Sequence, residues 1–264
     1  MLSRPEGAAN AVQSAGHISA QPAGAQTLYS HPTVSTSFAG TSTAQRPTPP
    51  GLDIIHSDSS LLVLNKPAGL LAVPGRGEDK QDCLSSRARA VYPDALVVHR
   101  LDMATSGLML MARGALVQRQ LSLAFAERTI HKRYEAVAHG FICMPDDASD
   151  GWSSIDLPIA ADWARRPLRV IDVLHGKPSL TRWQLLSHDK AAGTSRVSLE
   201  PITGRSHQLR VHLQALGHPI VGDALYANVA SPSKSSRLLL HACQLALTHP
   251  ASGDDMVFKS AVPF

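Results

Sequence analysis

Short apolar runs, each stopped by turn-forming residues, constrain the fold of this chain more than any other feature. The first clear run is Leu61-Leu62-Val63-Leu64, which ends at Asn65-Lys66-Pro67 and Gly69. Apolar runs of this length between turn residues are typical of strands. Further runs predict strands at 96–98, 108–111, 134–137, 181–186, 196–199, 238–240 and 245–248. The strands at 96–98 and 108–111 should pair in antiparallel fashion across a turn at 104–107.

Three other segments have the spacing of helices. Residues 81–91 have apolar positions at roughly helical intervals, and 208–216 predicts a short helix stopped by Gly217 and Pro219. The segment 115–126 predicts a helix packed on a sheet, because it carries the apolar residues Leu116, Leu121, Leu123 and Phe125. The sequence therefore predicts an α+β fold with a mainly antiparallel mixed sheet, flanked by helices and loops.

The first 50 residues differ in composition from the rest of the chain. They are rich in Ala, Ser, Thr, Gly and Pro, and their charged side chains are only Arg4, Glu6 and Arg46. Such a segment buries too little apolar surface to offset the entropy of ordering it. We therefore expect a disordered tail over 1–50 and one catalytic domain over 51–264.

The overall composition is that of an ordinary globular enzyme, with 44% hydrophobic residues and a formal net charge of +4. This mild basicity fits a nucleic-acid partner. The chain has no apolar run of membrane-spanning length and no secretory signal pattern, so we expect a cytoplasmic protein. Cys83, Cys143 and Cys243 show no CxxC spacing, which predicts reduced thiols rather than zinc or disulfides. Without a long heptad repeat, we expect a monomer.

The segment from Val98 to Arg113 reads VHRLDMATSGLMLMAR and places Asp102 in a turn directly after a predicted strand. Reactive groups are commonly presented in such turns. A carboxylate held there can act as a nucleophile or as a base. The plainer interpretation is that Asp102 caps the turn and that Arg100 is a solvated surface charge.

The segment from Leu199 to Gly222 is rich in cationic and imidazole groups. If 208–216 is helical, His207 and Arg210 share one face of the helix. The planar guanidinium suits a carboxylate or a phosphate. The plainer interpretation is a basic, solvated helix. The histidines could also indicate a metal, but no carboxylate–histidine set with ligand spacing accompanies them, so we expect no metal site.

The segment RTIHKRY, which ends at Tyr134, combines several cationic side chains with one aromatic ring. Such a combination can hold phosphates and stack an extruded base. The plainer interpretation is that Tyr134 is a strand residue that fills the core.

Together these segments resemble the RluA-type family of pseudouridine synthases. HRLD with TSG, then KRY, PITGRSHQLRVH and GHPIVGD, occur in the order and spacing of that family. NKPAGLLAVPG at 65–75 and RLLLHA at 237–242 extend the resemblance to about residues 52–264. Five motifs in register make coincidence implausible. The resemblance implies the family's fold and isomerisation of uridine in RNA, a reaction that needs no redox cofactor and no ATP.

Within the family, the resemblance is closest to its dual-specificity member. This rests on VPGR at 73–76, HRLDMATSG at 99–107 and DLPI at 156–159, with Asp162-Trp163 after it. It implies two RNA partners, a tRNA anticodon stem-loop and a large-subunit (23S) rRNA hairpin. The chain departs from that member in its 50-residue tail and in a longer loop at 141–152.

The resemblance also implies roles for individual residues. Asp102 would be the essential carboxylate, and Arg100 would enter the space vacated by a flipped uridine. Tyr134 would pack on the uracil face, and Arg210 would pair with Asp102. The order of steps stays open: Asp102 could attack the sugar or the base, or remove a sugar proton. The RNA contacts are expected from His99, Arg128, Lys132, Arg133, Arg165, Arg166, Arg205 and His207.

Three other functions are weighed against this one. A relative with a single tRNA or rRNA target would share the same catalytic segments. A catalytically silent RNA-binding protein would have no need of a placed carboxylate. A metal-dependent hydrolase would need a ligand set that the histidines do not supply.

Overall fold

The computed structural model describes residues 51–146, 148–227 and 235–264. The predicted tail over 1–50 lies outside these residues. The elements are β1 (Ile54–Ser57), β2 (Leu61–Lys66), the short 3-10 helix η1 (Glu78–Lys80), α1 (Leu84–Val91), β3 (Ala95–Val97), β4 (Ser106–Arg113), α2 (Ala115–Glu127), β5 (His131–His139), β6 (Ser153–Asp156), β7 (Ile159–Ala161), β8 (Arg169–Ile171), β9 (Leu180–Asp189), β10 (Thr194–Pro201), α3 (Gln208–Ala215), β11 (Leu240–Thr248) and β12 (Asp255–Lys259). Within the described residues, no helix is long and apolar enough to cross a membrane.

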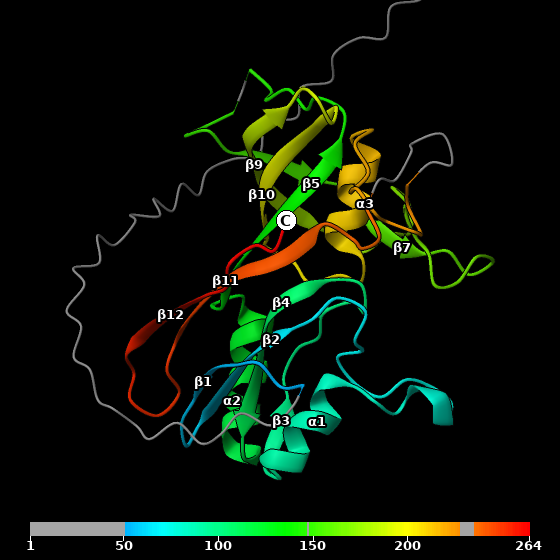
Figure 1. Ribbon diagram of the computed structural model, residues 1–264. Helices are drawn as coiled ribbons and strands as arrows, with labels where there is room; N and C mark the ends of the chain where they lie inside the picture. Colours follow the sequence, from blue (N-terminus) through cyan, green and yellow to red (C-terminus); the bar gives the residue numbers. More distant parts are fainter. Residues whose placement is uncertain (1–50, 147, 228–234) are drawn as a thin grey trace, which may run out of the picture. The chain divides into compact units, whose positions relative to one another are not determined.

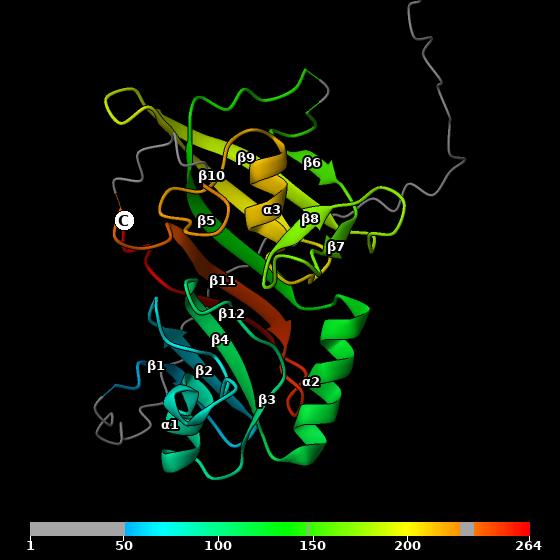
Figure 2. The ribbon, with the colours of Figure 1, turned by 90° about the vertical axis from the view of Figure 1, so that its right-hand side faces the viewer.

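A sheet of ten strands organises the described part of the chain. Its order is β1-β2-β4-β11-β5-β10-β9-β6, with β12 paired to β11 and β3 paired to β4. The β4–β11 pair is parallel, and the other pairs of this sheet are antiparallel. Strands β7 and β8 form a separate antiparallel pair. This confirms the predicted α+β fold with a mainly antiparallel mixed sheet (Figures 1 and 2).

Strands β2 and β4 are covered on both faces, which explains their continuous apolar sequences. Side chains alternate between the two faces of a strand. Leu62 and Leu64 enter one hydrophobic cluster with α1, whereas Leu61 and Val63 enter a second cluster with α2. The predicted antiparallel pairing of 96–98 with 108–111 is confirmed by β3 and β4.

Helix α2 packs on the sheet through part of the predicted set of apolar residues, Leu121 and Phe125. Leu121 is buried, with Val117 and Phe125 beside it, at the spacing of one helix face. Leu116 and Leu123 are 75% and 57% exposed, so the prediction that they pack on the sheet is wrong. Apolar content alone did not identify the contact face.

The C-terminal strands also differ from the prediction. The runs at 238–240 and 245–248 were predicted as two strands, but β11 continues from Leu240 through Thr248. Its register against β5 shifts between Ala242 and Gln244, and the shift interrupts the apolar pattern. Strands β1, β6, β7, β8 and β12 were not predicted, because each is short and only partly buried.

One row across the sheet brings distant segments together at its centre. Gly107 of β4 lies opposite Ala242 of β11, which in turn lies opposite Tyr134 of β5. Gly107 has a φ of 111°, and a β-carbon there would overlap the Ala242 carbonyl oxygen. Glycine is therefore required for the close approach of β4 and β11. The loop that carries Asp102 enters β4 just before this row.

We predict that Gly107→Ala destabilises the protein by at least about 2 kcal/mol, because it adds overlap with β11 to the strain of a positive φ. The matched control is Gly193→Ala, where φ is also positive but no atom lies within 4 Å of the added β-carbon. The free energies of unfolding from urea titration provide the comparison. Equal losses for the two variants would contradict the packing argument.

Candidate active site

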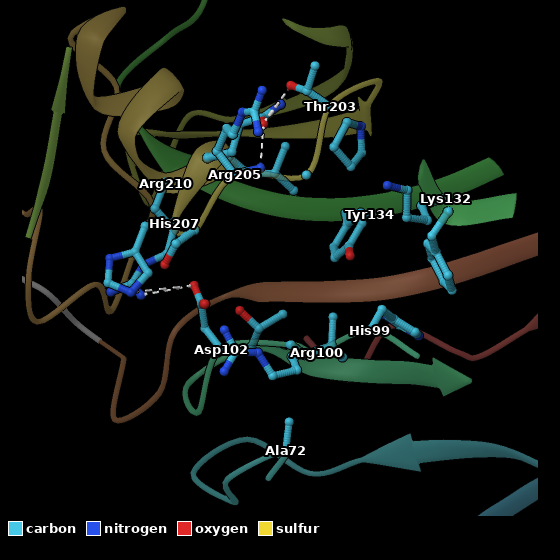
Figure 3. A pocket seen from close by; sticks show the side chains of 18 of the residues that line it. Ala72, His99, Arg100, Asp102, Lys132, Tyr134, Thr203, Arg205, His207 and Arg210 are labelled. Atoms are coloured by element: carbon cyan, nitrogen blue, oxygen red, sulfur yellow. Dashed lines mark hydrogen bonds and ion pairs between the residues drawn. The ribbon is translucent and has the colours of Figure 1, made fainter. Parts of the chain in front are cut away.

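A cleft of about 810 Å³ opens above the central row of the sheet. It is lined by the loop before β4, the end of α2, β5 and the segment that leads into α3 (Figure 3). Among the described residues that line it, Asp102 is the single acidic side chain. The cationic residues of the lining are Arg100, Arg128, Lys132, Arg205 and Arg210. The cleft therefore combines one carboxylate with a lining suited to a polyanion.

Asp102 lies in the turn between β3 and β4, and its side chain is 28% exposed. Its backbone carbonyl accepts a hydrogen bond from the Thr105 amide at 3.1 Å, which closes the turn. Its Oδ2 atom accepts from Nη1 of Arg210 at 3.3 Å and lies 4.0 Å from Nε2 of His207 (Figure 3). Asp102 is thus oriented by groups from α3, and it remains open to the cleft.

Arg210 is buried, so the interpretation of 208–216 as a basic, solvated helix is wrong. Its Nε and Nη2 atoms donate to the two carboxylate oxygens of Asp223, each at 2.7 Å. Burial lowers the pKa of Arg210, but its hydrogen bonds to Asp223 and the charges of Asp223 and Asp102 together outweigh burial and raise this pKa. The remaining donor, Nη1, is directed at Asp102.

His207 precedes α3 with a φ of 59°, in the left-handed region. Its Nδ1 atom lies 2.7 Å from the hydroxyl of Tyr226, which also accepts from the Arg169 amide at 2.9 Å. Burial lowers the pKa of His207, although the Asp102 carboxylate opposes that shift. The strained backbone and the Tyr226 contact fix the imidazole edge toward Asp102.

Tyr134 fits both interpretations of its segment. It is a buried residue of β5 within the larger hydrophobic cluster, and it also lines the cleft. Burial raises the pKa of its phenol, and the neighbouring Asp102 carboxylate adds to this shift. The ring is therefore a fixed, neutral surface at the floor of the cleft, close to Asp102.

Arg100 is exposed at the rim of the cleft, two residues before Asp102. Among the described residues, its guanidinium has no ion-pair partner within 4.0 Å. Arg205 reaches the same cleft from the loop before α3. Gln208 shapes that loop, because its Oε1 atom accepts from the Arg205 amide at 3.0 Å.

The predicted RNA-binding residues divide into two groups. Those that line the cleft are His99, Arg128, Lys132, Arg205 and His207. The others lie outside it: Arg133 is paired with Glu200 at 2.6 Å, and Arg165 is paired with Asp162 at 2.7 Å. The Arg166 guanidinium covers the ring of Trp163, 3.7 Å from its centre.

His99 supports the strand behind the cleft. Its Nε2 atom accepts from the Leu110 amide at 2.8 Å, and its ring packs against Phe125. Burial lowers the pKa of His99 to about 3, and Lys132 adds to this shift. The imidazole is therefore neutral near pH 7 and acts as an acceptor within the fold.

Two residues near Asp102 were not assigned a role from the sequence. Asp223 anchors Arg210, and Lys66 is fully buried with its Nζ atom donating to the carbonyls of Pro67, Leu70 and Met103. Burial lowers the pKa of Lys66 to about 8, and Asp102 opposes the shift. Lys66 lies in the motif NKPAG, and Asp223 lies in the motif GHPIVGD. The motifs alone do not indicate which groups these two side chains contact.

The described ranges contain no group of three or more His, Cys, Asp or Glu residues arranged to hold a metal ion. Within them, His212 donates from Nε2 to the Leu157 carbonyl and its Nδ1 atom contacts the Thr181 hydroxyl, and His218 donates to the carbonyl of His139. These histidines make local contacts within the fold, and the described residues supply no set of metal ligands for a metal-dependent hydrolase.

The fold agrees with comparisons against known proteins. Residues 60–215 match the family model described as RNA pseudouridylate synthase. The chain belongs to this family, and it is an RNA pseudouridine synthase, an isomerase.

Individual proteins that are similar to this chain have names of the same family. The chain is 45% identical over 218 residues to the dual-specificity RNA pseudouridine synthase RluA of Escherichia coli K12, covering 83% of this chain and 96% of that protein. It is 46% identical over 209 residues to the protein of the same name from Vibrio vulnificus, covering 78% and 81%. The solved structure of human RNA pseudouridylate synthase domain containing 1 matches with a TM-score of 0.66 and 30% identity, covering 83% of this chain and 87% of that one.

We predict that His99→Gln makes stability less sensitive to acid. Between the folded pKa of about 3 and the ordinary value of 6.5, the unfolded chain binds a proton that folded His99 does not. Wild-type stability therefore falls as pH drops below 6.5, whereas glutamine keeps an acceptor without titrating.

Urea unfolding between about pH 7 and pH 5 measures this effect, and wild type should lose up to about 1 kcal/mol more per pH unit than the variant. Identical slopes would mean that His99 takes up its proton in the folded state.

Proposed function

We propose that Asp102 carries out the isomerisation in the cleft, with Arg100, Tyr134 and Arg210 as its partners. The observation that carries this proposal is the placement of one partly exposed carboxylate in a basic cleft, held by a buried arginine. The reaction breaks the bond from C1′ of the ribose to N1 of uracil and joins C1′ to C5. C5 loses its hydrogen as a proton and N1 takes up a proton, so uridine and its product are isomers and no electrons are gained or lost.

The target uridine must leave the RNA stack before this chemistry, at a cost of a few kcal/mol. Arg100 is suited to enter the vacated space, because it is exposed at the rim and unpaired within the described ranges. Tyr134 is suited to pack on the detached uracil, since its ring is held in the floor of the cleft. Arg210 keeps Asp102 aimed at the reacting atoms.

The phosphates flanking the target would be held by Arg128, Lys132 and Arg205, which line the same cleft as Asp102. We propose His99 and His207 as supporting residues of this RNA site, and Arg133, Arg165 and Arg166 as outer contacts. Substitution of an outer arginine should weaken binding to all RNA substrates and reduce its salt dependence.

For the substrate we propose dual specificity, with one uridine in a tRNA anticodon stem-loop and one in a 23S rRNA hairpin. Its support is the high similarity to relatives named as dual-specificity synthases, which extends over most of their length. A single tRNA or rRNA target is the alternative. We further propose that the enzyme acts as a monomer in the cytoplasm.

A silent RNA-binding protein is the remaining alternative. Binding needs cations and aromatic surfaces, but it does not need a carboxylate in the middle of a cationic cleft, where it repels phosphate. A carboxylate held by Arg210 at this position serves catalysis, whereas it weakens the binding of phosphate. This favours the enzyme.

We predict that Asp102→Asn abolishes turnover while RNA affinity stays within roughly threefold of wild type or improves, because the variant removes one negative charge. Release of tritium from RNA with 5-tritiated uridine measures turnover, and filter binding measures affinity. The substrates are a tRNA anticodon stem-loop and a large-subunit rRNA hairpin.

Release of tritium from both RNAs by wild type supports dual specificity, and release from only one of them supports a single RNA target. The control variant is Asp189→Asn, an exposed carboxylate in the β9–β10 turn, which should leave turnover unchanged. Retained turnover in Asp102→Asn would contradict the catalytic assignment.

A further inference from the structure

A second cleft, of about 560 Å³, adjoins the first. Gly204, Arg205 and Ser206 line both clefts, so the loop before α3 forms the divide between them. The outer side of the second cleft is formed by β7, β8 and the turns around them. This region lies beside α3 in Figure 2. An RNA strand that enters the first cleft can therefore continue into the second.

Trp163 lines this second cleft and is 74% exposed. The other two tryptophans differ: Trp183 is buried in the core, and Trp152 lies under the guanidinium groups of Arg133 and Arg182. Arg166 stacks on Trp163 at 3.7 Å, which holds the ring in place. An exposed indole supported by an arginine is a suitable platform for an unpaired base.

The charges around Trp163 favour an anionic ligand. Asp172, which lines the cleft, is engaged with His175 and with two backbone amides, and Asp162 beside Trp163 is paired with Arg165. Within the described ranges, the side chains of Arg169 and Lys177 have no ion-pair partner within 4.0 Å. Both line the second cleft.

Arg169 connects the two clefts electrostatically. Its backbone amide donates to the Tyr226 hydroxyl, and that hydroxyl contacts His207 of the first cleft. The charge of Arg169 also contributes to the lowered pKa of His207, after the larger effect of burial. Arg169 and Arg205 both line the second cleft, so both are available to a phosphate bound there.

We propose that the second cleft binds an unpaired nucleotide of the RNA substrate that flanks the flipped uridine. Its base stacks on Trp163, and its phosphates are held by Arg169, Lys177 and Arg205. This proposal rests on the proposed function, because it extends the RNA path from the site of Asp102. It assigns to Trp163 the recognition of a loop nucleotide outside the reacting site.

The first test compares Trp163→Ala and Trp163→Phe in the full chain, with the anticodon stem-loop as the RNA. Loss of a base–aromatic stack should raise KM roughly tenfold in Trp163→Ala and leave kcat within about twofold, because the reacting groups are untouched. Trp163→Phe should restore most of the affinity, since phenylalanine also stacks. The matched control is Leu174→Ala, which removes an 85% exposed apolar side chain that does not line either cleft.

Tryptophan fluorescence locates the contact independently of turnover. RNA binding should quench the fluorescence of wild type, and Trp163→Phe should lose most of that quenching while it still binds RNA. Replacing the stacked loop nucleotide with an abasic one should remove the difference between wild type and Trp163→Ala.

The proposed phosphate contact of Arg169 is tested by the salt dependence of RNA binding. Arg169→Gln should reduce the slope of log K against log salt by about one, the effect of losing one phosphate contact. Lys190→Gln, an exposed lysine in the β9–β10 turn, should leave the slope unchanged.

Unchanged KM in Trp163→Ala, or full quenching in Trp163→Phe, would overturn the proposal for the second cleft even though wild type forms pseudouridine. If wild type releases no tritium from either RNA, the proposed function fails. In that case the fluorescence and salt experiments still report whether RNA occupies the second cleft.

Discussion

The site depends on one buried guanidinium with two carboxylates. Arg210 donates twice to Asp223, which is fully buried, and once to Asp102, which faces the cleft. A buried arginine without an anionic partner is strongly unfavourable, so the Asp223 pair fixes the position of the guanidinium. The planar arrangement of its donors then determines where the remaining one points. Asp102 is consequently oriented by a group that cannot move without breaking a buried ion pair.

The fold brings these groups together across the sheet. Asp102 precedes β4, whereas Arg210 stands 108 positions later on α3. The row from Gly107 through Ala242 to Tyr134 connects, within the sheet, the segments that carry these two residues. The requirement for glycine at position 107 thus bears on the position of Asp102. The same row places the ring of Tyr134 close to the Asp102 carboxylate, so the register of the strands determines the geometry of the site.

Much of this could be predicted from the sequence. The strand–turn–strand around Asp102 and the helix carrying Arg210 followed from local patterns, and the family followed from five motifs in register. The contact face of α2 could not be predicted, since Leu116 and Leu121 are equally apolar and only the packed sheet distinguishes them. Asp223 and Lys66 gave no local signal, because their roles depend on partners that only the fold brings close. Trp163 was noted as part of a motif, but its exposure beside a second cleft required the structure.

Single-turnover rates of pseudouridine formation in Asp223→Asn test whether Asp223 holds Arg210 so that Asp102 is aimed. The enzyme is in saturating excess over the RNA, and folding is checked by urea unfolding in the same samples. We expect a rate at least roughly tenfold below wild type in the folded variant, while RNA affinity changes little, because Asp223 lies behind the cleft. A wild-type rate in the folded variant would show instead that the position of Asp102 does not depend on the pair between Arg210 and Asp223.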